Sequence, residues 1–285
     1  MKLFASYKLV ALVVLLALVA STVGVAAVCD TTVVTNDDVV RLAHGATPAP
    51  GTHWALYTRD NGTGDFVTGP GTPPSGVGSL SLRTPANNDK VYLFNYDHIG
   101  TPLSSINAIS YSTYRDATST AIPVQAPALN IEVDYNGPNV AGGFTTLVFE
   151  PVYNTNQGPV VPGQWQSWDA YAGGNAVWWS TKDIPGVCSF NCFVSWSDIL
   201  AANPDAVILG GFGVNQGGGN PGLYAAVDTL SLGYGDNCVT YDFEPFRVAA
   251  TKDDCKAGSW SSFKRADGTS FKNQGQCIQY VNTGK

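Results

Sequence analysis

The sequence predicts an all-β protein, an antiparallel β-sandwich of the jelly-roll type. Short runs of β-forming residues recur between breaks rich in Gly, Pro and Asn. Charged residues make up only 13% of the chain, whereas Gly (31) and Pro (17) are abundant. This combination is typical of an extracellular sandwich or barrel rather than of a helical cytosolic protein.

The expected strands follow the runs of β-forming residues. In "LNIEVDY" (129–135), apolar and polar residues alternate, so that one face of the strand is apolar. The connection at 59–77 is too rich in Gly and Pro to be a central strand. The predicted strands are 53–58, 78–84, 90–96, 108–115, 128–135, 143–150, 164–170, 176–181, 206–214, 224–233 and 239–245.

One short helix is expected in "SWSDILAANPDA" (195–206). Ser195 is a suitable N-cap, and Asp198 stands three residues later, as in a capping box with Asp in place of Glu. Pro204 ends the helix. We expect this helix to cover one open end of the sandwich.

The first 27 residues have the pattern of a secretory signal peptide. Lys2 and Lys8 precede an apolar run, and small residues follow, with cleavage expected after Ala26 or Ala27. Retention of the run as an uncleaved anchor is the alternative. Cleavage would give a secreted, extracellular protein without a membrane attachment. We then expect a sandwich domain at 28–246 and a small basic appendage at 247–285.

Charge is unevenly distributed along the chain. In residues 251–285, six Lys and Arg against three Asp give +3. The signal segment carries +2 and the whole chain −7, which leaves −12 on residues 28–250. So acidic a core disfavours nucleic acid and anionic lipid as partners, and leaves neutral glycans, cations or other proteins.

All six cysteines lie after the signal segment, an even number that predicts disulfides in an exported chain. Six cysteines allow fifteen pairings. Proximity favours Cys188–Cys192 and Cys255–Cys277, and elimination then leaves Cys29–Cys238. The alternative for "CSFNC", a zinc half-site, lacks a second Cys or His pair nearby.

Four segments carry a resemblance to a known family: "FVTGPGTPPSGVGSLSL" (66–82), "GQWQSWDAY…WWST" (163–181), "AAVDTLSLGYGDNCVTYDFEP" (225–245) and "CKAGSWSSF…FKNQGQCIQYV" (255–281). Together they resemble secreted bacterial jelly-roll proteins, mostly described as hypothetical or cell-surface proteins and without an established activity. The architecture is more distantly similar to carbohydrate-binding modules and concanavalin-like lectins. This resemblance implies a fold and only weakly a function.

No catalytic residues are assigned, because the chain lacks the nucleophile, zinc and phosphate-loop motifs of common enzymes. Glu132 and Asp134 share a strand face, but Asn136 and Gly137 follow them, so the general acid of a retaining glucanase is missing. We therefore prefer a polar strand face or a cation site. A calcium ion is the one cofactor considered, with Asp60, Asn61 and Asp65 as candidate ligands, although Asp-Asn-Gly is also an ordinary turn.

Four of the seven tryptophans lie between residues 163 and 181. On strands, Trp165 and Trp168 face opposite sides, and so do Trp178 and Trp179, so one of each pair can lie in the core. The other can stack on a sugar. The candidate ligand-binding residues are Trp168, Trp179, Asp169, Tyr171 and Asn175.

The sequence thus predicts a secreted, non-catalytic binding module for glycans or another cell-surface ligand. A structural or adhesive surface protein is the alternative, and a glycan hydrolase or lyase is a weaker one. If all four tryptophans served only as core residues, the structural alternative would be favoured.

Overall fold

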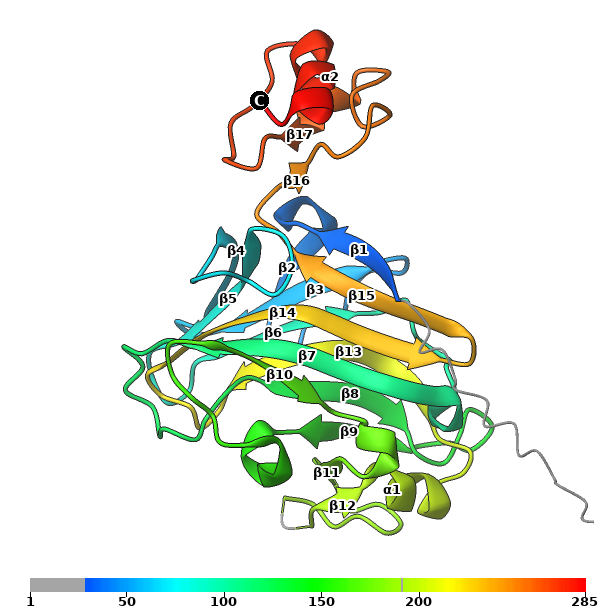
Figure 1. The fold of residues 1–285 in the computed structure, drawn as a ribbon. Coiled ribbons are helices and arrows are strands. Elements are labelled where there is room, and N and C mark those ends of the chain that lie inside the picture. The colour runs from blue at the N-terminus through cyan, green and yellow to red at the C-terminus, as the bar shows by residue number, and fades with distance from the viewer. Residues whose placement is uncertain (1–28, 191) are drawn as a thin grey trace, which may run out of the picture.

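The computed structural model describes residues 29–190 and 192–285. The expected signal segment lies outside these residues. Two β-sheets pack face to face, and a small C-terminal unit stands apart from them at one end (Figure 1). The all-β sandwich expected from the sequence is confirmed.

The first sheet has seven strands and is built around the long strand β14. One side of β14 pairs with β15 near Leu230–Tyr234 and with β5 near Leu223–Val227; the other side pairs with β7. Its strands are β1 (Asp30–Val34), β4 (Thr63–Thr68), β5 (Gly78–Thr84), β7 (Ile106–Arg115), β10 (Trp165–Asp169), β14 (Leu223–Tyr234) and β15 (Asn237–Phe243).

The second sheet has eight strands in the order β12-β11-β9-β8-β13-β6-β3-β2. Its strands are β2 (Val39–Ala43), β3 (Trp54–Arg59), β6 (Lys90–Asn95), β8 (Ala128–Asp134), β9 (Phe144–Phe149), β11 (Val177–Ser180), β12 (Val194–Ser195) and β13 (Val207–Gly217). Each strand run expected from the sequence coincides with a strand in one of the two sheets.

The sheets are mixed, so the expectation of purely antiparallel pairing is wrong. β1 runs parallel to β15, and β2 runs parallel to β3. Both parallel strands lie at sheet edges, and the remaining pairs in the two large sheets are antiparallel.

Alternating side chains build the core between the sheets. On β8, Leu129, Ile131 and Val133 are fully buried against the other sheet, as the period-two pattern predicts. Intervening residues point to the outer face of the eight-stranded sheet. A separate aromatic cluster covers part of that face, formed by Ala55, Tyr57, Tyr92 and Phe94.

Helix α1 (Trp196–Ala202) begins where the capping pattern places it. The Asp198 amide donates to Ser195 Oγ at 3.1 Å, and Ser195 Oγ donates to the Asp198 carboxylate at 2.6 Å. Trp196 and Ile199 are buried and belong to the core. The helix therefore covers the sandwich core, as expected.

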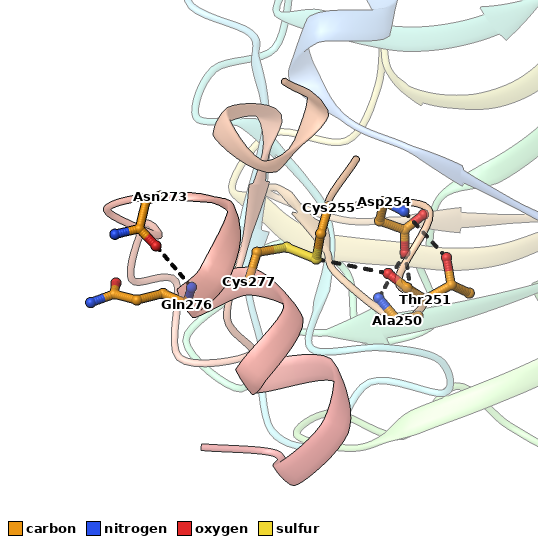
Figure 2. The surroundings of a disulfide bond; sticks show 7 residues. All are labelled: Ala250, Thr251, Asp254, Cys255, Asn273, Gln276 and Cys277. Atoms are coloured by element: carbon orange, nitrogen blue, oxygen red, sulfur yellow. Dashed lines mark hydrogen bonds between the residues drawn. A yellow bond between two sulfur atoms is a disulfide. The ribbon is translucent and has the colours of Figure 1, made fainter. Parts of the chain in front are cut away.

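The C-terminal unit has its own small core, formed by Ala249, Cys255, Phe271 and Cys277. It contains β16 (Arg247–Val248), β17 (Phe263–Lys264) and helix α2 (Gln274–Thr283). The sequence predicts only one helix, so α2 corrects that expectation. Figure 2 shows how the Cys255–Cys277 disulfide joins α2 to the turn at 250–255, while Asn273 caps the helix by accepting the Gln276 amide at 3.0 Å.

The other two disulfides join Cys29 to Cys238 and Cys188 to Cys192, so all three pairs are those expected. Three disulfides are typical of an oxidising, extracellular environment. Within residues 29–190 and 192–285, no helix has the length and apolar composition needed to span a bilayer.

Candidate functional site

The four clustered tryptophans divide between core and surface. Trp168 and Trp178 are 1% and 0% exposed, and each indole N–H is bonded inside the core, to Thr113 Oγ1 and to the Ala170 carbonyl. Trp165 and Trp179 are only half-buried and lie on different sheets. Because a buried ring has no face to offer a sugar, Trp168 is removed from the candidate ligand-binding residues.

The other residues predicted to bind the ligand on this segment, Asp169, Tyr171 and Asn175, form a local turn instead. The Asp169 carboxylate accepts the amides of Tyr171 and Ala172 at 3.0 and 2.7 Å, and Asn175 Nδ2 donates to the Ala172 carbonyl at 3.2 Å. These residues follow β10 of the seven-stranded sheet. None of them lines the groove beside Trp179 on the other sheet.

Trp179 forms an aromatic pair with Phe190. The ring centroids are 5.0 Å apart with an interplanar angle of 38°, and Phe190 is 60% exposed. Trp179 Nε1 donates to the Glu150 carboxylate at 2.8 Å, which fixes the orientation of the indole. Phe190 was not a predicted site residue.

The short loop closed by Cys188–Cys192 places Phe190 beside this indole. The Phe190 amide donates to the Ser180 carbonyl at 3.3 Å, so the loop is tied to β11. Phe190 also has a φ of 58°, a conformation that costs a non-glycine residue about 1–3 kcal/mol and that often occurs at functional sites. A disulfide loop of this kind around one aromatic residue is the signal that could have identified Phe190.

Trp179 and Phe190 line one side of a groove of about 580 Å³ on the outer face of the eight-stranded sheet. The strand register places Gly213, Asn130, Val148 and Trp179 in one row across β13, β8, β9 and β11. Trp179 and Asn130 are two strands apart, a backbone separation of about 10 Å. Val148 on β9 lies between them in this row, and most of the other residues that line the groove are small or polar.

Glycine is required in this floor. A Cβ on Gly213 would lie 1.9 Å from the Leu93 carbonyl oxygen, so a side chain there would collide with β6. A Cβ on Gly211 would meet the Phe94 ring at 2.2 Å. Close packing against β6 thus explains Gly211 and Gly213 in the run "GGFGVNQGGG".

Three amide side chains in the groove have unsatisfied oxygens. The side-chain oxygens of Gln125, Asn130 and Asn215 are buried and accept no hydrogen bond within the described part of the chain. A buried acceptor without a donor costs about 1–3 kcal/mol. A terminal amide rotates readily, so a ligand hydroxyl that donates to one of these oxygens would recover that cost.

Two carboxylates lie on the same face. Burial raises the pKa of both Glu132 and Glu150, and each accepts one hydrogen bond, from the Gly211 amide and from Trp179 Nε1 respectively. Glu132 pairs in register with Thr146, so Glu150 lies four residues further along β9, at a backbone separation of about 13 Å. This backbone separation exceeds the distance of about 5–9.5 Å between the carboxyl groups of glycosidase pairs, and no catalytic role is assigned to the two glutamates.

The candidate calcium ligands are spread over one hairpin. Asp60 is exposed in the turn between β3 and β4, the Asn61 amide donates to Asp89 Oδ1 at 3.0 Å, and Asp65 forms an ion pair with Arg41 at 3.2 Å. Among the described residues, no three His, Cys, Asp or Glu side chains gather in a metal-binding arrangement. Calcium binding stays a prediction.

A group of buried carboxylates outside the groove comprises Asp228 in the middle of β14 and Asp242 and Glu244 at the C-terminal end of β15. Asp228 accepts the amides of Phe243 and Ser75 at 3.0 and 3.1 Å, and Glu244 accepts those of Val77 and Gly78 at 2.7 and 2.9 Å. Burial raises the pKa of Asp228 to about 7, with help from the charge of Asp242. These residues hold the 69–78 segment against the sheet.

Fold and site together define the class of protein: a disulfide-linked β-sandwich with an aromatic and amide-lined groove on one sheet face. Comparison with protein-family models, curated proteins and solved structures gave no match to this chain. The resemblance to secreted jelly-roll proteins therefore stays a prediction.

Proposed function

We propose that this protein is a secreted glycan-binding module whose site is the groove beside Trp179. The observation that carries the proposal is the combination in one groove of an aromatic pair, the half-buried Trp179 and the exposed Phe190, with amide side chains whose oxygens have no donor among the described residues. Aromatic faces stack on the apolar faces of sugar rings, and amides bond their hydroxyls. The jelly-roll type of the sandwich, secretion and the bound glycan belong to this proposal.

A second hollow, of about 330 Å³, lies on the seven-stranded sheet and offers weaker support for binding. Its charged groups are already engaged: Asp116 accepts from Thr118, Asp65 pairs with Arg41, and Arg83 lies 5.1 Å from the centre of the Tyr224 ring. None of its lining residues has a buried polar atom without a partner among the described residues. The groove beside Trp179 is therefore the preferred site.

The test compares two half-buried tryptophans on opposite sheets. Trp165, like Trp179, has a bonded indole N–H, which donates to the Pro70 carbonyl at 2.9 Å. After a glycan array has identified a ligand, Trp179→Ala should weaken its binding by about 1–3 kcal/mol, a value scaled from stacking on other planar ligands. Trp165→Ala should leave the affinity unchanged.

Calorimetric titration measures both affinities, and thermal unfolding checks that both variants fold. Trp179→Phe should retain part of the binding because the ring face is kept. A glycan array with no bound sugar would overturn the proposal, as would equal losses of affinity in the two alanine variants.

A further inference from the structure

The groove has two cations at the end remote from Trp179. Arg59 on β3 and Lys90 on β6 both line it, and they are direct partners in the strand register. Both side chains are half-buried. Two positive charges therefore stand opposite each other on the face that we propose binds a glycan.

Neither charge is neutralised by a nearby carboxylate. The ion pairs in the described residues use Arg41, His53, Arg247 and Lys256 as cations. Arg59 Nε donates to the Asn88 carbonyl at 2.7 Å, which leaves the two terminal nitrogens of the guanidinium for other partners. Lys90 Nζ lies 5.1 Å from the centre of the Tyr92 ring.

The two charges disfavour each other. Like charges directly opposite on adjacent strands are destabilising. Burial and the charge of Arg59 lower the pKa of Lys90, and Glu132, on the same face two strands away, offsets this only in part. An anion bound between Arg59 and Lys90 would remove the repulsion and form charge-assisted hydrogen bonds with both.

An anionic group carried by the same ligand as the sugar rings would fit the span of the groove. Four strand steps separate β6 from β11, a backbone distance of about 19 Å, and the groove is continuous over that span. A ligand that reaches from the cations to Trp179 is therefore an oligosaccharide rather than a single sugar. The planar fork of Arg59 fits a planar carboxylate in a bidentate contact.

We propose that the glycan bound in this groove carries carboxylate groups, so that the ligand is a polysaccharide containing uronic acid. This inference rests on the proposed glycan-binding function and names its substrate class. The overall charge of −7 disfavours anionic polymers at long range. At about 0.15 M salt, however, exposed charges are screened beyond about 8 Å, so the contacting groups decide local binding.

The experiment uses polyuronates and their carboxyl-reduced counterparts, which keep the linkage but lose the charge. Several polyuronates, each with its reduced form and with a sulfated polysaccharide for comparison, are titrated calorimetrically against the full exported protein. We expect at least about tenfold tighter binding of one polyuronate than of its reduced form, scaled from hydrogen bonds to charged groups. The preference should decrease with added salt.

Variants locate the effect. Arg59→Gln and Lys90→Gln should each reduce polyuronate affinity about tenfold and leave the affinity for the reduced polymer unchanged. Arg83→Gln is the matched control, since Arg83 lies on the other sheet. Lys90→Arg keeps the positive charge, so it should retain binding. It replaces Lys90→Gln in the comparison if that variant does not fold.

The outcomes separate the two proposals. Equal binding of charged and reduced polymers, with loss in Trp179→Ala, would overturn the uronate inference and leave the glycan-binding function standing. A preference for the sulfated polymer, or an equal loss in Arg83→Gln, would also overturn the inference. Absence of binding to every polymer and every arrayed glycan would overturn both proposals.

Discussion

Asp228 should make the protein less stable as the pH rises. Its side chain is fully buried, and burial raises its pKa from 3.8 to about 7. A carboxyl with a raised folded-state pKa loses its proton more readily in the unfolded chain. Its contribution to stability is therefore complete below about pH 4 and is lost as the pH rises towards 7.

The size of the effect follows from the two pKa values. Between pH 5 and pH 8, the linkage relation gives a loss of about 2.5 kcal/mol in the free energy of unfolding from this group. Burial also raises the pKa of Asp242 and Glu244, so both act in the same direction. The lowered pKa of buried His98 acts in the opposite direction near pH 6.

A double difference isolates Asp228 from these other groups. The free energy of unfolding of the wild type and of Asp228→Asn is measured by denaturant titration at pH 5 and pH 8, with disulfides intact. Asn cannot accept from both the Phe243 and Ser75 amides as the carboxylate does, which adds a cost that is independent of pH. Relative to the wild type, the variant should gain about 2.5 kcal/mol between pH 5 and pH 8.

The matched control is Asp236→Asn, an exposed aspartate in the turn between β14 and β15. It should change the free energy of unfolding by less than about 0.5 kcal/mol at either pH. If Asp228→Asn differed from the wild type by the same amount at both pH values, the raised pKa of Asp228 would be refuted.

A core tryptophan and the N-cap of α1 should contribute to stability by different amounts. Trp178→Ala should cost about 3–5 kcal/mol in denaturant titration, because the ring is 0% exposed and packs on Phe149 and Trp196; a cost below about 1 kcal/mol would contradict its core role. Ser195→Ala should cost about 1 kcal/mol through loss of the cap on α1, and Ser195→Thr, which keeps the hydroxyl, should retain most of the stability; an unchanged midpoint in Ser195→Ala would show that the cap adds nothing.

The strands inside the sheets and the edge strand β10 could be read from the sequence, but the edge strands β1, β2, β4 and β12 could not. β4 lies within the 59–77 connection, whose Gly and Pro residues argue against a strand. Because β4 is at the edge of the seven-stranded sheet, these residues are tolerated there. β1 and β2 are short and lie outside the runs that we recognised. Their parallel pairing is invisible to a period-two pattern, which is the same for both strand directions.

The second helix, α2, has capping residues at both ends that are visible in the sequence. Asn273 at the N-cap and Gly284, which has a positive φ at the C-cap, bracket α2, but "QGQCIQYVNT" contains Gly and β-forming residues that weaken a helical interpretation. Tertiary packing stabilises the helix instead, because the Cys255–Cys277 disulfide holds α2 on the small core of the C-terminal unit.

The candidate site was partly predictable. Alternation along β11 identifies Trp179 as a surface residue once Trp178 is in the core. The same reasoning left open which of Trp165 and Trp168 is buried. It could not find Arg59, Lys90, Asn130 and Asn215, since they reach one face through the order of strands in the sheet, which no local pattern encodes.

The C-terminal unit and the Trp179 end of the groove lie toward opposite ends of the sandwich. The unit joins the sandwich beyond β15, where Arg247 bonds both carboxylate oxygens of Asp38, at 2.6 and 2.7 Å, whereas β11 lies at the far end (Figure 1). A tether attached to α2 would therefore leave the Trp179 end of the groove facing away from the point of attachment.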